Sequence, residues 1–540
     1  MSWSPPSSST AAISLSNPAL AHLSLSDRTF FLTNGIGATR NTPFPIVHHA
    51  IEHQARLNPS AIAVEHTLYN HKLTYGALDV AANRLARRLR HDFGIVPGQR
   101  VCLLARRSIY LVIAIVAVLK SGAQYVPVDA VTVTDATLAH ILGDAKPGVV
   151  LVMEEYLGRL NGRDEGKICL ENAVEEDERN NADGSKMEPD LTKESDGCYV
   201  IYTSGTTGTP KGVDVRHNGA ANVICAAPGN VHMRPGMRVA QLLNIAFDMG
   251  AWEILSSLYN GCTLCLRGNT SKEWAALMKS VDVVISTPSI LARHDPKEYT
   301  NLKHVIVGGE VCAQALADNW AAYTQFNNCC GPTEISICNT IQPHTPGYPL
   351  SIGKPIPNTN VYILDPSWSP LDPSSITSSS YPHPMPVGQV GLMYVGGMGV
   401  SRGYLNLPEK TRERYVPDPF LGEGWMMFNT GDLGRWREDG QIEHCGRKDE
   451  QVKVKGFRVE LDGVGEAMRG RATVEGAVAL LIHEELWGFV TPEWVDLETV
   501  RKETSKSQPY YAVPSRWVAM KEFPMTRNGK VDKRALRDVA

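Results

Sequence analysis

The stretch Tyr202-Thr203-Ser204-Gly205-Thr206-Thr207-Gly208-Thr209-Pro210-Lys211-Gly212 decides how this chain is interpreted. The apolar residues before it, 197–201, predict a strand that leads into the stretch. Glycines let backbone N–H groups approach an anion closely, and the hydroxyls and Lys211 add donors and positive charge. The spacing does not fit the Walker loop Gly-x-x-x-x-Gly-Lys-Ser/Thr. We therefore predict a phosphate-binding loop, and the alternative is a flexible Gly/Thr linker.

Length and composition place limits on the kind of protein. A chain of 540 residues is too long for one hydrophobic core, so two or more domains are expected. The formal net charge is −4 without a basic stripe, which argues against nucleic acid or an anionic membrane as a partner. The longest apolar run, Leu111 to Leu119, is too short to span a membrane. Eleven cysteines at irregular spacing indicate reduced thiols, so we expect a cytoplasmic protein.

Strand and helix patterns alternate in the first half of the chain. Val101 to Leu104 reads as a strand, Tyr110 to Lys120 as a buried helix, and Tyr125 to Val128 as another strand. This order predicts parallel pairing and an α/β sheet. Cys262 and Cys265 lie in an apolar run that resembles a strand, and no second cysteine pair follows at a zinc-like distance. We predict buried thiols there rather than a metal site.

The composition divides the chain into three predicted parts. Residues 1–40 are rich in Ser and Pro and are expected to be a disordered leader. Residues 41–448 form a large core, and residues 449–540 form a small terminal domain of short strands and helices. Two solvated loops are expected inside the core, a charged insertion at 161–192 and a Ser/Pro tract at 366–386. Short β-rich pieces with glycine turns follow and predict a small β subdomain.

Further motifs fit the same chemistry as the predicted phosphate loop. They are Phe247–Glu253, Gly331–Glu334, Thr430–Asp432, Gly446–Lys453 and Asn528–Lys533. In this order and over this distance, the set resembles the adenylate-forming (ANL) superfamily. Within it, the chain is similar to the adenylation domains of nonribosomal peptide synthetases over nearly its whole length. The resemblance implies an α/β fold: a large body of α/β sheets with a small β subdomain, followed by a small mobile α+β C-terminal domain.

The resemblance also implies a reaction. An amino acid is activated with ATP and Mg²⁺ to an aminoacyl-AMP, pyrophosphate leaves, and the acyl group passes to the phosphopantetheine thiol of a carrier domain. A carboxylate is a poor electrophile, and making the mixed anhydride requires a triphosphate cradle, a metal, a ribose anchor and a mobile cation. No carrier signature follows Lys530, so the carrier is expected in trans or in a missing part of the protein. Whether the chain is an excised domain or stands alone is open.

The resemblance assigns roles to individual residues. The nucleotide and metal contacts are Thr203, Ser204, Gly205, Thr206, Thr207, Gly208 and Lys211 for the triphosphate, Thr333 for phosphate, Glu334 for Mg²⁺, Gly309, Glu310 and Asn328 for adenine, and Asp432 and Arg447 for ribose. Asp449 is the implied hinge, and Lys530 is the implied catalytic cation for the adenylation step. Cys330 departs from the family, which has an aromatic residue there to stack on adenine.

The substrate pocket is also assigned through the resemblance. Its residues are Asp248, Met249, Trp252, Ser286, Ile306, Gly308, Cys329, Ile337, Cys338 and Lys530. Asp248 is implied to pair with the α-ammonium of an amino acid. The remaining wall carries no charge beside Lys530, so a neutral side chain is expected, phenylalanine or tyrosine first. The rival substrate is a small betaine-like molecule whose quaternary ammonium contacts Trp252. A further alternative is that Trp252 and Met249 are core residues without a role in substrate binding.

Two other functions remain open from the sequence. One is an acyl- or aryl-CoA ligase on the same fold, against which Asp248 argues. The other is a binding or scaffold protein with a decayed site. The retained site residues argue against decay; they are Lys211, Glu334, Asp432, Arg447 and Lys530.

Overall fold

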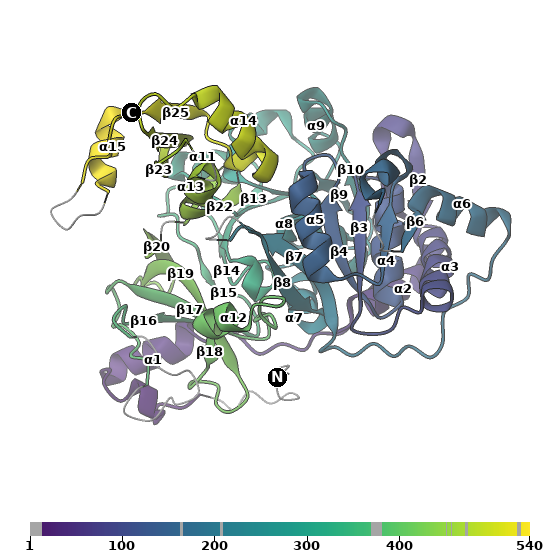
Figure 1. Ribbon diagram of the computed structural model, residues 1–540. Coiled ribbons are helices and arrows are strands. Elements are labelled where there is room, and N and C mark those ends of the chain that lie inside the picture. Colours follow the sequence, from purple (N-terminus) through teal and green to yellow (C-terminus); the bar gives the residue numbers. More distant parts are fainter. Residues whose placement is uncertain are drawn as a thin grey trace.

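The computed structural model describes residues 13–162, 166–205, 209–368, 381–449, 451–454, 456–469, 473–525 and 531–540. The roles predicted for Thr206, Thr207, Gly208 and Lys530 therefore concern residues outside the described part of the chain. Figure 1 shows a large α/β body, a β subdomain and a C-terminal domain that lies above the junction of the other two.

The sheet that carries the predicted phosphate loop has six strands within the described residues. In spatial order they are β6 (Lys167–Cys169), β5 (Val149–Val152), β3 (Arg100–Ala105), β4 (Gln124–Asp129), β7 (Gly197–Thr203) and β8 (Lys211–Arg216). All neighbours are parallel except β7 and β8, which form an antiparallel hairpin. The predicted parallel pairing of β3 with β4 and the strand before the loop are confirmed.

A second body sheet has nine strands within the described residues. In spatial order they are β15 (Lys354–Pro355), β14 (Thr340–Pro343), β13 (Gln325–Cys330), β12 (His304–Val307), β11 (Val283–Ser286), β9 (Arg238–Gln241), β10 (Thr263–Leu266), β1 (Ile62–His66) and β2 (His71–Thr74). The strands from β13 to β1 are parallel, and their carboxyl ends meet at one edge. Cys262 and Cys265 are buried free thiols beside and within β10, as predicted.

The body helices cover and separate these sheets. They are α2 (Val47–Leu57), α3 (Tyr75–Phe93), α4 (Ile109–Lys120), α5 (Asp135–Ala145), α6 (Leu170–Arg179), α7 (His217–Ile224), α8 (Asp248–Tyr259), α9 (Ser271–Met278), α10 (Pro288–Leu291) and α11 (Gln314–Ala321). Helix α4 is apolar on all sides and contacts both β3–β4 and β1. A helix without a polar face is stable only when it is buried all round, which explains its place between the two sheets.

The β subdomain lies beside the body (Figure 1). Its strands are β16 (Thr359–Leu364), β17 (Gly391–Gly397), β18 (Tyr415–Pro417), β19 (Met426–Trp436) and β20 (Ile442–Arg447), with α12 (Pro408–Arg414) next to them. Its strands β17 to β20 follow the Ser/Pro tract, as the predicted change to short strands indicated, whereas β16 precedes the tract.

The N-terminal segment differs from the disordered leader that we predicted. Within residues 13–40, helix α1 (Leu25–Asn34) is capped by Ser24 and packs on the β subdomain. Phe31 is buried and stacks on Tyr362 of β16, with ring centroids 5.9 Å apart. The charged insertion at 161–192 also differs, because it contains β6 and the amphipathic helix α6.

The C-terminal domain has its own hydrophobic core. Its elements are β21 (Gln451–Val454), β22 (Phe457–Glu460), α13 (Leu461–Arg469), β23 (Gly476–Ile482), β24 (Glu485–Thr491), α14 (Leu497–Ser507), β25 (Arg516–Ala519) and α15 (Lys533–Val539). The 3₁₀ helices within the described residues are η1 (Pro18–Leu20), η2 (Thr67–Tyr69), η3 (Glu154–Leu160), η4 (Pro296–Glu298), η5 (Thr333–Ile335) and η7 (Tyr510–Ala512). The α/β fold class with a small β subdomain is confirmed.

Candidate active site

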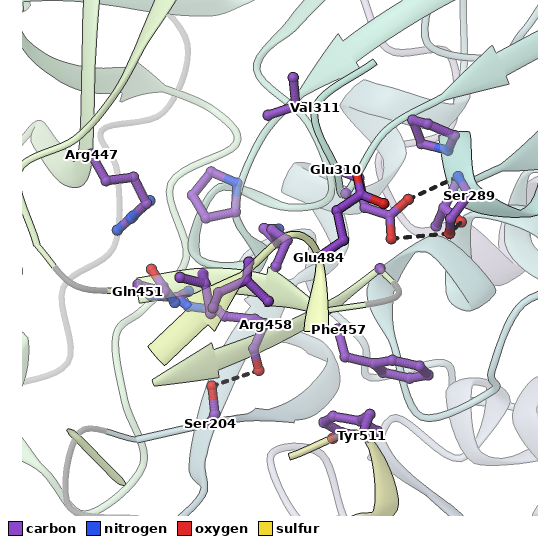
Figure 2. A pocket seen from close by; sticks show the side chains of 18 of the residues that line it. Ser204, Ser289, Glu310, Val311, Arg447, Gln451, Phe457, Arg458, Glu484 and Tyr511 are labelled. Carbon is purple, nitrogen blue, oxygen red and sulfur yellow. Dashed lines mark hydrogen bonds between the residues drawn. The ribbon is translucent and has the colours of Figure 1, made fainter. Parts of the chain in front are cut away.

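A cavity of about 2860 Å³ lies where the body, the β subdomain and the C-terminal domain meet. The ends of β7 and β13 and the loops after β9, β11 and β12 contribute to its wall, together with the start of α8. Ligand sites of α/β sheets form at these carboxyl ends. From the C-terminal domain, the hairpin β21–β22 reaches the same cavity (Figure 2).

The described part of the predicted phosphate loop is held between β7 and β8. Thr203 and Lys211 pair across this hairpin, which places the lysine at the mouth of the loop. The Lys211 ammonium donates to the Tyr404 hydroxyl at 3.4 Å and lies 4.5 Å from that ring's centroid. Burial, together with the charge of Arg458, lowers the pKa of Lys211 to about 8. Ser204 Oγ donates to the Arg458 carbonyl at 2.9 Å (Figure 2).

Glu334 is a fully buried carboxylate on η5, and three side chains surround it. Both Glu334 oxygens accept from Arg458 Nη1 at 3.0 Å, and Oε1 also accepts from the Tyr404 hydroxyl at 2.8 Å. Lys211 Nζ is 3.9 Å from Oε1. Burial opposes ionisation, but Arg458 and Lys211 outweigh it and hold the pKa of Glu334 at about 2. The carboxylate is therefore charged and suited to bind a hard cation such as Mg²⁺.

The residues predicted to bind ribose lie together at the edge of the β subdomain. Asp432 of β19 is opposite Arg447 of β20, and Arg447 Nη1 donates to Asp432 Oδ1 at 2.5 Å. Arg447 Nε also donates to Asp449 Oδ1 at 2.6 Å, and Arg414 donates to the other Asp449 oxygen at 3.2 Å. The predicted hinge residue is thus tied to the ribose anchor by charge-assisted hydrogen bonds.

The residues predicted to line the adenine site hold neighbouring loops. Glu310 accepts from the backbone N–H and the hydroxyl of Ser289, at 2.9 and 3.0 Å (Figure 2). Gly309 has φ +80°, a conformation that favours glycine. Asn328 donates to the Ser351 carbonyl at 2.7 Å. Burial raises the pKa of Cys330 to about 12, so the residue in the aromatic position of the family is a neutral thiol.

Asp248 is the first residue of α8 and faces the cavity. Its Oδ2 accepts from Thr333 Oγ1 at 2.6 Å, and its Oδ1 accepts from the Met249 N–H at 2.8 Å. Burial raises the pKa of Asp248 despite these hydrogen bonds and the charge of Lys453. Through Thr333, the carboxylate predicted to bind substrate is linked directly to the Gly331–Glu334 motif.

Four residues of the predicted substrate pocket line the cavity with Asp248: Met249, Trp252, Cys329 and Ile337. A Cβ built on Gly308 would lie 2.5 Å from Cys329 Sγ and 3.7 Å from Met249 Cε. The space that Gly308 leaves is therefore already filled by these two side chains. Trp252 is fully buried, and its Nε1 donates to the Gly229 carbonyl at 2.8 Å.

Ser286, Ile306 and Cys338 are buried and do not belong to the cavity wall formed by the described residues. Ser286 Oγ donates to the Thr287 carbonyl at 3.3 Å, at the end of β11. Ile306 is inside β12.

Two cavity residues of the β21–β22 hairpin, Lys453 and Arg458, were not assigned a role from the sequence. Lys453 ends the Gly446–Lys453 motif, whereas the only signal for Arg458 was its place in a strand pattern, where charged residues usually face solvent. Phe457 of the hairpin stacks on Tyr511 within the C-terminal domain, with ring centroids 3.9 Å apart (Figure 2), and it meets Phe247 of the body edge-on at 5.1 Å.

Comparison with known proteins identifies the family of the chain. Residues 51–405 match the family model described as AMP-binding enzyme. The chain is 50% identical over 521 residues to adenylate-forming reductase 06235 of Coprinopsis cinerea, covering 96% of this chain and 49% of that protein. It is 34% identical over 492 residues to nonribosomal peptide synthetase 5 of Aspergillus fumigatus, covering 90% of this chain and 21% of that protein.

A solved Vibrio cholerae adenylation domain in complex with glycyl-adenosine-5′-phosphate shares the fold, with a TM-score of 0.76 and 22% identity. That match covers 93% of this chain and 98% of the solved one. The chain belongs to the AMP-binding family of adenylate-forming enzymes. It spans about half the length of the curated reductases that it matches. None of the helices in the described residues is long and apolar enough to cross a membrane.

Proposed function

We propose that this chain is the adenylating part of a longer protein and activates an amino acid. The carboxylate of the amino acid attacks the α-phosphate of ATP, so that an aminoacyl-AMP forms and pyrophosphate leaves. The acyl group then passes to the phosphopantetheine thiol of a carrier domain. The observation that carries this proposal is Asp248, a carboxylate at the cavity wall whose own hydrogen bonds within the described residues come from one hydroxyl and one N–H. A substrate ammonium supplies the missing ion-pair partner.

The nucleotide end of the cavity fits ATP with Mg²⁺. Lys211 and the predicted phosphate loop receive the triphosphate, and Asp432 and Arg447 receive the ribose. Glu334, charged and fully buried, would hold Mg²⁺, which when bound neutralises phosphate charge. In the described arrangement Arg458 occupies both Glu334 oxygens. The C-terminal hairpin therefore has to withdraw from Glu334 before the metal can bind there, in keeping with a mobile C-terminal domain that turns at Asp449.

The pocket supports a neutral substrate side chain. Met249, Trp252, Cys329 and Ile337 carry no charge, and the cation whose charge reaches Asp248 is Lys453 of the C-terminal hairpin, so a charged substrate side chain would be buried against an uncharged wall. Met249 and Cys329 fill the space beside Gly308, which favours a small side chain over phenylalanine or tyrosine. The indole of Trp252 is tied to the Gly229 carbonyl, which supports a packing role for it.

The partner is proposed from the relatives. The reductases matched over 96–97% of this chain are twice its length, and the synthetase relatives are longer still. A carrier domain supplied by the remainder of such a protein, or by a separate one, would accept the acyl group. The adenylate-forming reductases support the alternative in which the activated acid is then reduced elsewhere in the protein.

Pyrophosphate exchange tests the proposal against the acyl- or aryl-CoA ligase alternative. The purified chain is incubated with ATP, Mg²⁺ and labelled pyrophosphate, and a panel of acids is compared: neutral amino acids, glutamate, lysine, glycine betaine, benzoate and fatty acids. We expect exchange with neutral amino acids or betaine. Exchange with benzoate or fatty acids, and none with amino acids, would overturn the amino-acid proposal. Strong exchange with glutamate or lysine would show that the pocket has been assigned incorrectly.

A further inference from the structure

A histidine and carboxylate cluster lies far from the adenylation site. It consists of His48 and His49 at the start of α2 and Asp190, which precedes β7. His48 Nε2 is 3.2 Å and His49 Nε2 is 2.7 Å from the same oxygen, Asp190 Oδ2. Among the described residues, this is the group of three such side chains whose donor atoms converge, all within 4.8 Å of one another.

The cluster belongs to the opposite end of the β7–β8 hairpin from the predicted phosphate loop. The loop follows Thr203, where β7 ends, whereas Gly197 begins β7 and pairs with Arg216, where β8 ends. His217 follows directly, its ring centroid is 5.8 Å from that of His48, and its N–H donates to the Asp196 carbonyl at 3.0 Å. Seven strand residues span about 20 Å. The cluster therefore cannot contact the nucleotide bound at the other end.

We infer that His48, His49 and Asp190 bind a divalent transition metal of the Zn²⁺ class. Two imidazole nitrogens and one carboxylate oxygen are the donor set that suits Zn²⁺, Co²⁺ or Ni²⁺ rather than Mg²⁺ or Ca²⁺. Bonds of about 2.0–2.1 Å in a tetrahedral site separate ligand atoms by about 3.4 Å. The His48–Asp190 distance of 3.2 Å is already near this value, whereas His49, at 2.7 Å, has to move away from the carboxylate oxygen by about 0.7 Å, and its partly exposed side chain leaves room for this. A fourth position is left for water.

Hydrogen bonds from neighbouring residues orient Asp190 and the segment that carries it. Asp190 Oδ1 accepts from the Thr192 N–H at 3.0 Å, which leaves Oδ2 to the two histidines. Arg90 donates to the Pro189 carbonyl at 3.1 Å and so holds the segment before Asp190. Such second contacts orient a carboxylate ligand.

The three side chains differ in solvent exposure, so the site has a buried side and an exposed side. The His48 side chain is 1% exposed, whereas those of Asp190 and His49 are 17% and 33% exposed. A metal ion can therefore reach the cluster from solvent past His49 and meet His48 as its innermost ligand. Once bound, it would join α2 to the segment that leads into β7, and so stabilise the body rather than take part in adenylation.

Metal binding to the whole chain tests the inference. The purified protein is treated with EDTA, dialysed and titrated with Zn²⁺, with Co²⁺ in parallel because its visible absorption reports the coordination number. We expect one equivalent to bind, Tm to rise, and EDTA to reverse the rise. His49→Gln and Asp190→Asn each remove one ligand and should weaken binding at least about tenfold. His91→Gln, an exposed histidine at the end of α3, is the matched control and should bind as the wild type does.

Adenylation activity is measured on the same samples, so failure of this inference is separate from failure of the proposed function. His49→Gln should keep wild-type exchange activity in the standard assay with Mg²⁺ and without added Zn²⁺, which shows that the variant is folded. If the wild type binds no stoichiometric Zn²⁺, or His49→Gln and Asp190→Asn bind it as tightly as His91→Gln does, the cluster is a hydrogen-bonded clamp and the inference is wrong.

Discussion

The proposed phosphate end and the proposed substrate end of the cavity each hold a carboxylate, and the surroundings of these two carboxylates are opposite. Glu334 has Arg458, Lys211 and Tyr404 around it, and its pKa is held at about 2. Asp248 has a hydroxyl and an N–H, and burial raises its pKa. The first carboxylate is balanced by the chain itself, whereas the second lacks a comparable ion pair within the described residues. In this arrangement Asp248 is the carboxylate left for a substrate ammonium, in line with the proposed function, whereas Glu334 has to release Arg458 before it can hold Mg²⁺.

Stability measurements on the protein without ligands should give opposite results for the two carboxylates. Glu334→Gln leaves Arg458 without its buried partner, so we expect the free energy of unfolding to fall by about 3–5 kcal/mol. Asp248→Asn removes a charge that burial disfavours, so stability should stay equal or rise by up to about 1 kcal/mol. Urea denaturation of both variants beside the wild type measures this. A similar loss in both would contradict the contrast.

The pH dependence of stability follows from the same two shifts. The pKa of Glu334 is lowered from 4.5, so its contribution to stability is present above pH 4.5 and is lost as the pH falls toward 2. The pKa of Asp248 is raised from 3.8, so the folded state holds that proton more tightly, and its ionisation costs stability as the pH rises above 3.8. Denaturation of Glu334→Gln at several pH values should show a smaller acid-dependent loss than the wild type.

Unlike stability, activation of the amino acid should depend strongly on Asp248. Asp248→Asn keeps an acceptor for Thr333 but leaves the substrate ammonium without a partner. Losing this ion pair removes about 3–5 kcal/mol of transition-state stabilisation, which lowers kcat/KM for the amino acid by a factor of about a hundred to a few thousand. The KM for ATP should change little. Asp295→Asn, an exposed helix cap, is the control. Wild-type amino-acid kinetics in Asp248→Asn would favour the acyl-CoA ligase alternative.

Lys530 lies outside the described part of the chain, and its catalytic role stays a prediction. An ammonium placed on developing charge contributes about a hundredfold or more. Lys530→Ala should therefore lose most pyrophosphate exchange without a loss of stability. Transfer from preformed aminoacyl-AMP should suffer far less, because the lysine is expected at the site only during adenylation. Unchanged exchange would contradict the assignment.

The phosphate end can be examined by titrating Lys211. Its pKa of about 8 means that the ammonium is charged below this pH and neutral above it. The kcat/KM for ATP, at saturating amino acid, should fall about tenfold per pH unit above about pH 8. Lys211→Arg keeps its charge at every pH in this range and should lack the decline. If Lys211→Arg shows the same decline, another group is responsible.

Features formed by contiguous residues could be predicted from the sequence, whereas features formed by packing between distant segments could not. The predicted phosphate loop and the Gly331–Glu334 motif are contiguous, so their composition carries the signal. Lys453 and Arg458 reach the cavity only because a separate domain packs on the body, and their strand pattern resembles that of solvent-exposed residues. Helix α1 was missed for a similar reason: the polar leader hides Phe31, whose partner Tyr362 is more than three hundred residues away.

The smallest expected effect concerns the depth of the substrate end. Met249 lies beside Gly308 together with Cys329, and these two side chains limit the space available to a substrate. Met249→Ala removes several methylene-sized groups from this wall. For a small native substrate the lost contact should cost about 1 kcal/mol, so kcat/KM falls about fivefold, and larger neutral amino acids such as phenylalanine should gain activity. The panel of neutral amino acids, measured on both proteins, gives the comparison. If the wild type already prefers phenylalanine and Met249→Ala tolerates it unchanged, the wall is elsewhere and the pocket is deeper than the contact between Met249 and Cys329 indicates.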